Sequence, residues 1–390
     1  MNSDTDLIFV LFLILAGSAL LGTLMLWARQ ALIIGYILAG IAVGPWALGW
    51  VADTRVIGEL SEAGIIFLLF LLGLDLTPQK LFSLFRQTAL VTLMTSVVFA
   101  VAGALFGLAV GFSWMDSVLV GATCMFSSTI IGIKLLPTTV LHHRHTGEVI
   151  ISVLLLQDLV AIAVIMTLQA MGQAGAETSD ILLPLLALPV LALGGYAVER
   201  HVLLPLFRRF DQVQEYIFLV TLAWCLGMAW AGHAAGLSYE LGAFIGGVIL
   251  ATSPIAKFIA NRLHPLRDFF LVLFFFALGA QLNLDVVPGV LLPAAGLAIL
   301  MLVLKPLVYR YAFQQVAESR DLAWETGWRL GQMSEFSLLV TFMAMQVPAF
   351  SADVIILIQV ATVLTIMGSS SIVVFNFPTP VALNRKLRRD

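Results

Sequence analysis

Charged side chains are scarce in this chain, at 11% of 390 residues, while hydrophobic residues make up 61% and the mean hydropathy is +1.03. Soluble domains carry about 25% charged residues, so these proportions exclude an ordinary soluble fold. The two cysteines, Cys124 and Cys225, both lie in apolar runs, which excludes a disulfide framework. The sequence has no Walker motif, G-x-G-x-x-G fingerprint, metal-ligand spacing or nucleophile elbow, and its basic tail is too short to indicate nucleic-acid binding. We therefore expect neither an enzyme nor a cofactor.

Apolar runs long enough to cross a bilayer recur along the whole chain, each needing roughly 20 residues. We predict an all-α integral membrane protein with thirteen transmembrane helices, which begin near residues 8, 31, 55, 87, 116, 148, 181, 215, 237, 266, 287, 321 and 352. The N-terminal residues lack a basic region, so the first run is predicted to be a retained helix and not a cleaved signal.

Basic residues occur in alternate predicted loops, which indicates the orientation in the membrane. One set of loops holds Arg29, Lys80, Arg86, Arg144, Arg208, Arg209, Lys257, Arg262, Arg267, Arg310 and Arg320. The other set holds Asp53, Asp116, Glu177, Asp180, Asp285 and Asp353, with the single basic residue Arg55. The positive-inside rule then places the N-terminus outside and the basic tail, 378–390, in the cytoplasm. We expect a multi-pass protein of the cell (inner) membrane.

Two parts of the chain repeat at a nearly constant offset. The matched pairs are 35–40 with 242–247, 67–76 with 273–282, Ser127 with Ser334, and Asp158 with Thr365, at offsets of 206 or 207. The copies begin seven predicted helices apart, so they insert in opposite orientations. Inverted-topology repeats are typical of secondary transporters, whose sites lie near the midplane where broken helices meet. The alternative is a chance likeness between glycine-rich apolar helices.

Asp158 is the only charged residue between Val149 and Ala176, and it follows Gln157. A carboxylate near the bilayer centre is unfavourable by roughly 2.5–3.5 kcal/mol on insertion scales, and such groups mark ion and proton pathways. Burial raises the pKa of a carboxyl while a nearby cation lowers it. Asp158 is therefore predicted to carry either a proton or a monovalent cation, with Gln157 supporting the site. The absence of a second charge favours one proton per cation.

Hydroxyl-rich segments occur where two helices are expected to break. Ser127, Ser128 and Thr129 form the first segment, and Gln332, Ser334 and Glu335 belong to the second. Unwound backbone is tolerated at that depth only where it is buried or lines a watery cavity, and its oxygens can replace the hydration shell of a cation. In the alternative interpretation, the hydroxyls bond back to the preceding helical turn.

Lys305 is a second charge within an apolar run, only five residues before Arg310. We expect it to neutralise the half-helix ends or to pair with Asp158; the alternative is an ammonium that reaches the cytoplasmic surface. Glu335 is expected to compensate charge in the same region. A pairing with Arg329, or with a half-helix end, is as compatible with its position as direct contact with an ion.

Several stretches together resemble the second cation:proton antiporter family, and particularly its Kef-type potassium:proton exchangers. They are GYILAGIAVGP (35–45), FLLFLLGLDL (67–76), SSTIIGIKLL (127–136), LLLQD (154–158), LGAFIGGVILATS (241–253), LFFFALGAQL (273–282) and GQMSEF (331–336). The resemblance implies the sodium/proton antiporter-like fold, with crossed broken helices beside Asp158, and a homodimer. It also implies scaffold helices in 1–85 and 213–285, mobile core helices in 86–172 and 286–377, and a linker helix in 173–212.

In this resemblance the Gln157–Asp158 pair is typical of potassium-selective members, whereas Asn-Asp or Asp-Asp pairs are associated with sodium. The family usually has glycine where this chain has Ser334. Kef-type proteins continue into a cytosolic nucleotide-binding regulatory domain, and this chain stops at Asp390. The expected function is exchange of potassium for a proton by alternating access. Sodium/proton antiport is the first alternative, and a cation channel built on the same broken helices is a more distant one.

Overall fold

The computed structural model describes residues 7–51, 54–75, 78–128, 145–172, 178–210, 213–253, 255–315 and 320–377. Within these residues every regular element is a helix, which confirms the all-α prediction. Thr129 and the tail 378–390 lie outside the described residues.

The first part of the chain contains α1 (Leu7–Trp27), α2 (Leu32–Val43), α3 (Thr54–Asp75), α4 (Pro78–Val110), α5 (Trp114–Cys124) and α8 (His145–Gly172). The middle contains α9 (Thr178–Val198), the π-helix η1 (Glu199–Leu203), α10 (Leu204–Arg209), α11 (Gln214–Ala234), α12 (Tyr239–Ala251) and α13 (Ala256–Gln281). The last part contains α14 (Val287–Gln315), α15 (Arg320–Arg329), α16 (Glu335–Ala344) and α17 (Ala352–Asn376).

A helix begins within three residues of eleven of the predicted starts. The other two predicted spans begin inside longer helices: α4 begins at Pro78, with its candidate membrane span at Ala89–Val110, and α13 begins at Ala256. Six helices of the described residues are long and apolar enough to cross a membrane, and shorter apolar helices accompany them. The count of thirteen spans stays a prediction.

The chain divides into two compact units, which we describe separately. Unit 1 comprises 1–16, 40–82 and 173–281, and unit 2 comprises 17–39, 83–172 and 282–390. The resemblance assigns 86–172 and 286–377 to a mobile core, and the described parts of both ranges belong to unit 2. The motion itself, and the roles of scaffold and linker, stay predictions.

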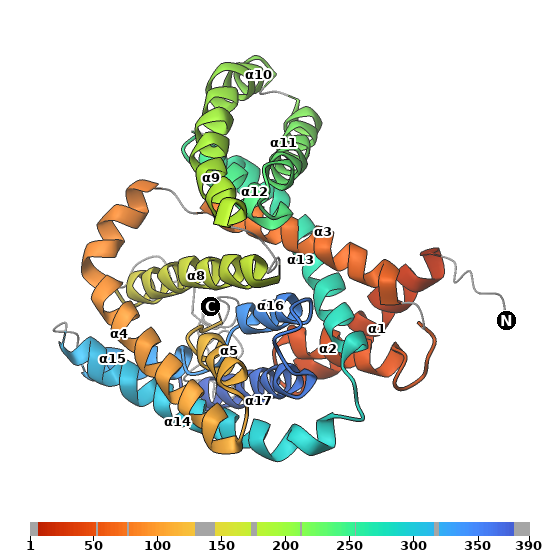
Figure 1. Cartoon of the computed structure of the whole chain (residues 1–390), viewed down its shortest axis with the longest axis vertical. Coiled ribbons are helices and arrows are strands. Elements are labelled where there is room, and N and C mark those ends of the chain that lie inside the picture. The colour runs from red at the N-terminus through yellow and green to blue at the C-terminus, as the bar shows by residue number, and fades with distance from the viewer. Residues whose placement is uncertain are drawn as a thin grey trace. The chain divides into compact units, whose positions relative to one another are not determined.

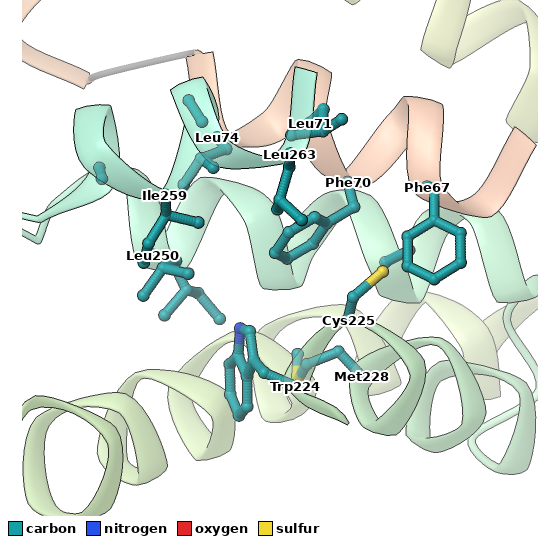
Figure 2. Packing of buried hydrophobic residues seen from close by; sticks show 14 of the residues in the cluster. Phe67, Phe70, Leu71, Leu74, Trp224, Cys225, Met228, Leu250, Ile259 and Leu263 are labelled. Carbon is teal, nitrogen blue, oxygen red and sulfur yellow. The ribbon is translucent and has the colours of Figure 1, made fainter. Parts of the chain in front are cut away.

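Unit 1 is held together by a buried apolar cluster to which α3, α11, α12 and α13 contribute (Figure 2). Phe70 of α3 and Leu250 of α12 are completely buried within it. Trp224 of α11 adds a polar link, because its indole Nε1 donates to the carbonyl oxygen of Gly246 at 3.0 Å. These helices therefore pack through apolar side chains and close backbone approach.

Close helix contacts in unit 1 repeat with the sequence offset. A Cβ added at Gly247 of α12 would collide with Phe70 O and lie 2.9 Å from Leu74 N, and one added at Gly40 of α2 would collide with Phe276 O and lie 2.8 Å from Ala280 N. Gly40 matches Gly247 at offset 207, and Phe70 and Leu74 match Phe276 and Ala280 at offset 206. The glycine of each copy therefore packs against the backbone of the matching phenylalanine in the other copy. Such reciprocal contacts are what a two-fold relation between the copies requires.

Gly247→Ala is expected to lower the stability of the protein by about 1–3 kcal/mol, because the added methyl group meets backbone that has no room to move. Gly40→Ala should have an effect of the same size. A matched control is Gly227→Ala on α11, where nothing lies within 4 Å of the added Cβ. Thermal unfolding in detergent should show lower midpoints for the first two variants only; equal midpoints for all three would contradict the close packing.

Unit 2 contains the two helix breaks. The helix α5 ends at Cys124, and the backbone from Phe126 to Ser128 is not helical. The segment from Leu330 to Ser334 likewise separates α15 from α16. α16 packs against both α5 and α8, which brings the breaks into one region of the unit (Figure 1).

The N-terminal end of α5 is linked by a hydrogen bond to the start of α17. Asp116, expected in a loop, lies in the first turn of α5 and is buried. Its Oδ1 accepts a hydrogen bond from the backbone N–H of Ser351 at 3.0 Å, and Ser351 in turn caps α17. The charge pattern did not reveal this contact, because an aspartate at this point of the sequence is compatible both with a loop and with the first turn of a helix.

Candidate functional site

The site is built from the two breaks of unit 2. At each break, side chains form hydrogen bonds with backbone groups that have no partner within a helix. The last carbonyl groups of a helix have no partner within the helix. At the end of α5 the Thr123 carbonyl accepts from Ser337 Oγ at 2.7 Å, and the Met125 carbonyl accepts from Gln157 Nε2 at 3.0 Å. Side chains of α16 and α8 therefore complete the helix that the first break ends.

The second break is completed in the same manner. Ser369 Oγ of α17 lies 3.3 Å from the carbonyl oxygen of Trp328 and 2.8 Å from Gln332 Oε1. Ser334 caps α16 by accepting from the N–H of Phe336 at 3.1 Å. Ser334 is fully buried, so the serine at this position fits the break as an ordinary helix cap.

Lys305 joins the two breaks. Its side chain is completely buried, and its Nζ donates to Phe126 O at 2.5 Å and to Gln332 O at 3.0 Å, with Ser127 Oγ at 3.3 Å. An ammonium has three donors, so these three oxygens occupy all of them. Because a helix C-terminus carries a partial negative charge, the ammonium also compensates the ends of α5 and α15. The surface-reaching alternative is wrong for this side chain.

A phenol that sequence analysis did not select completes this arrangement. Tyr309 lies one helical turn after Lys305 on α14 and is completely buried. Its hydroxyl accepts from Gln157 Nε2 at 2.7 Å and lies 3.3 Å from Ser127 Oγ. Ser127 gives its single proton to Leu330 O at 2.8 Å, so Tyr309 is the donor to Ser127. The spacing of four residues, which places two side chains on one helix face, is the signal that could have found Tyr309.

Asp158 follows Gln157 on α8, within the apolar section Leu156–Leu168, and only 2% of it is exposed. Gln157 bonds to both Met125 and Ser127 of the first break, so Asp158 is next to the break along α8. A carboxylate in this setting can hold a proton or a cation, while the lysine compensates the helix ends.

Most of the predicted site residues come together here. Ser127, Gln157, Lys305 and Gln332 are linked through hydrogen bonds, and Ser128 joins them weakly through Gln332 Nε2, 3.5 Å from its carbonyl oxygen. Their roles in ion binding stay predictions, and Thr129 lies outside the described residues.

The remaining charges of the second break lie at its edges. Glu335 is buried at the first position of α16, where its carboxylate faces a helix N-terminus and lies near Ser334 Oγ, with 3.3 Å between the two oxygens. Arg329, which the sequence suggested as a partner for Glu335, forms a salt bridge with Glu325 at 2.7 Å. Its guanidinium is nearly fully buried and lies 5.9 Å from the ring centroid of Phe377.

Two broken helices that meet beside a buried carboxylate, in an all-helical protein with internal repeats, are the architecture of secondary transporters. The comparison with known families agrees: residues 10–376 match the family described as sodium/hydrogen exchanger, transmembrane. The chain belongs to this family of cation:proton antiporters, and it is a multi-pass membrane protein.

The fold is similar to that of the sodium proton antiporter MjNhaP1 from Methanocaldococcus jannaschii. Its structure at pH 8 matches with a TM-score of 0.70 and 16% identity, over 94% of this chain and 95% of that one. A second MjNhaP1 structure, from electron microscopy, matches with a TM-score of 0.58 and 15% identity over 95% and 96%. This likeness confirms the predicted sodium/proton antiporter-like fold.

Proposed function

We propose that this protein exchanges a monovalent cation for a proton, and that the two compete for the carboxyl group of Asp158. The main support for this proposal is the burial of Asp158 next to an unwound segment. In that segment the carbonyl oxygens of Met125 and Phe126 accept hydrogen bonds from side chains. Burial favours the protonated carboxyl, whereas a bound cation favours the carboxylate, so either occupant neutralises the site.

Competition of this kind couples the two fluxes. When Asp158 is neutralised by a proton or a cation, the binding site can change its exposure from one side of the membrane to the other. An unoccupied carboxylate opposes this change, because a charge is unfavourable in an apolar environment. One carboxylate with the uncharged Gln157 beside it implies exchange of one cation for one proton. Alternating access then follows from rocking one bundle against another around a fixed site.

Potassium is the cation that we propose. Its support is the resemblance of the Gln157–Asp158 pair to Kef-type exchangers. Sodium is the alternative, and its support is the name of the family and of MjNhaP1. The same resemblance underlies two further proposals, a homodimer and a cytosolic nucleotide-binding regulatory domain as a partner. The alternation of basic and acidic loops underlies two others, a location in the cell (inner) membrane and a cytoplasmic C-terminus.

Proton flux in proteoliposomes that carry a pH-sensitive dye tests this function. Pulses of potassium, sodium and choline should give a large response to potassium, a smaller one to sodium and none to choline. A response to sodium alone would keep the antiport and overturn the potassium assignment. No response to either metal ion, in vesicles shown to contain folded protein, would contradict the antiport.

A further inference from the structure

The side-chain amide of Gln157 has a set of bonds that its place beside Asp158 does not explain. Its Oε1 accepts from the backbone N–H of Ser127 at 3.0 Å. Its Nε2 donates to Met125 O at 3.0 Å and to Tyr309 Oη at 2.7 Å. A glutamine amide has two donor hydrogens, so both are occupied, and the oxygen faces a backbone donor. Both donors of the amide and one of the two lone pairs on its oxygen are therefore used by the protein.

These bonds continue into a chain that connects both breaks. Gln157 donates to Tyr309, Tyr309 donates to Ser127 at 3.3 Å, and Ser127 donates to Leu330 O at 2.8 Å. Hydrogen bonds in such a chain polarise one another in a low-dielectric interior, so the loss of one member weakens the others. We call Gln157, Tyr309 and their bonds to Met125 and Ser127 the amide clamp.

The second copy of the repeat has a comparable bond without a carboxylate. The backbone N–H of Met333 donates to Thr365 Oγ1 of α17 at 3.0 Å, as that of Ser127 donates to Gln157 of α8. At offset 207 Thr365 matches Asp158 and Met333 matches Phe126, so this bond is displaced by one residue from the bond of the first copy. A side chain from the following helix thus holds an unwound N–H in both copies. The second bond uses a threonine at the position that matches Asp158, so an unwound N–H can be held without a carboxylate.

We propose that Gln157 and Tyr309 are positioning residues, which set the cation affinity of the site by holding the first break and do not bind the cation themselves. The proposal rests on the proposed function, since it assigns these residues to the same site. The amide clamp fixes where the oxygens of the first break lie relative to α8, and therefore relative to Asp158. Cation binding depends on ligand distances, so a looser break gives weaker binding while Asp158 still carries the proton.

Tyr309→Phe is the variant that separates positioning from ligation. It removes only the hydroxyl and keeps the ring, which packs on Phe99 and Phe313 with centroids 5.3 and 5.9 Å away. We expect the cation concentration for half-maximal transport to rise about tenfold, because one buried hydrogen bond contributes roughly that factor. The maximal rate and its pH dependence should stay close to wild type. Tyr311→Phe is the matched control, since Tyr311 is 64% exposed on the same helix.

Gln157→Met and the double variant with Tyr309→Phe complete the test. If both residues act through one clamp, the double variant should be no worse than Gln157→Met alone. An unchanged half-maximal concentration in Tyr309→Phe, together with a large increase in Gln157→Met, would make Gln157 a ligand and overturn the proposal. Additive effects in the double variant would overturn it as well.

A binding measurement keeps this test separate from the proposed function. A cation that binds the folded state raises its unfolding temperature in a concentration-dependent manner. The cation midpoint of that rise should shift about tenfold in Tyr309→Phe and stay unchanged in Tyr311→Phe. This comparison remains informative if the wild-type protein binds a cation but transports no protons. That result would contradict the proposed antiport and leave the amide clamp standing. Equal midpoints in wild type and Tyr309→Phe would overturn the amide clamp.

Discussion

Asp158→Asn should abolish cation-coupled proton movement, to the level of vesicles without protein. Asparagine has the shape of aspartate but neither binds a proton in the physiological range nor attracts a cation, so it removes both cargoes at once. The folded state should be as stable as wild type or more so, because a buried ionisable group has been replaced by a neutral one. Dye-monitored flux and thermal unfolding measure the two effects.

The matched control for this variant is Asp268→Asn. Asp268 is 56% exposed in its side chain and pairs with its neighbour Arg267. A surface pair of this kind contributes about 0–1 kcal/mol, so flux and unfolding temperature should both stay at wild-type values. Appreciable exchange in Asp158→Asn, with the control unchanged, would show that another group carries the proton.

Lys305→Met should differ from Asp158→Asn in stability: we expect it to lose transport as well, but together with a large loss of stability. Removal of the ammonium leaves Phe126 O and Gln332 O without their donor in a fully buried place. Each unsatisfied carbonyl costs about 1–3 kcal/mol. The ends of α5 and α15 also lose the positive charge that faces them. Thermal unfolding in detergent should show a midpoint many degrees below that of wild type.

Two other variants make this prediction specific. Lys305→Arg keeps the charge but presents its donors in a planar fork, which does not fit three oxygens around one nitrogen, so its stability should be intermediate. Arg310→Gln removes a cation from an exposed position on the same helix, where the guanidinium lies 4.9 Å from the ring centroid of Trp324. A cation–π contact at an exposed site contributes about 0.5–1 kcal/mol, so this variant should lower the unfolding temperature much less than Lys305→Met. Wild-type stability in Lys305→Met would mean that its hydrogen bonds do not support the breaks.

The sequence predicted the elements of the site that leave a chemical signal in an apolar background. Asp158 and Lys305 are visible because charge is rare in such helices, and Ser127 and Ser334 because hydroxyls gather where helices break. The shared offset of the repeat correctly matched Gly40 with Gly247, and these glycines allow equivalent helix contacts. Each of these residues is constrained by its own chemistry, so a single sequence is enough to find it.

The rest of the site depends on contacts that cannot be predicted from residue type alone. The main partners of Lys305 are backbone carbonyl oxygens, which every residue possesses. Tyr309 resembles other aromatic packing residues until its hydroxyl is seen between Gln157 and Ser127. The helices α4 and α13 begin before the predicted apolar spans for a related reason: apolar runs mark the bilayer core, whereas helices continue through charged residues beyond it.

The dependence of the cation half-maximal concentration on pH tests the central claim most directly. Where proton and cation compete for Asp158, that concentration should rise about tenfold for each unit by which the pH falls below the pKa of the carboxyl, at a constant maximal rate. Initial rates of proton flux across three pH units, over a wide range of potassium and sodium concentrations, provide it. A half-maximal concentration that stays the same while the maximal rate changes with pH would contradict competition at a single carboxylate.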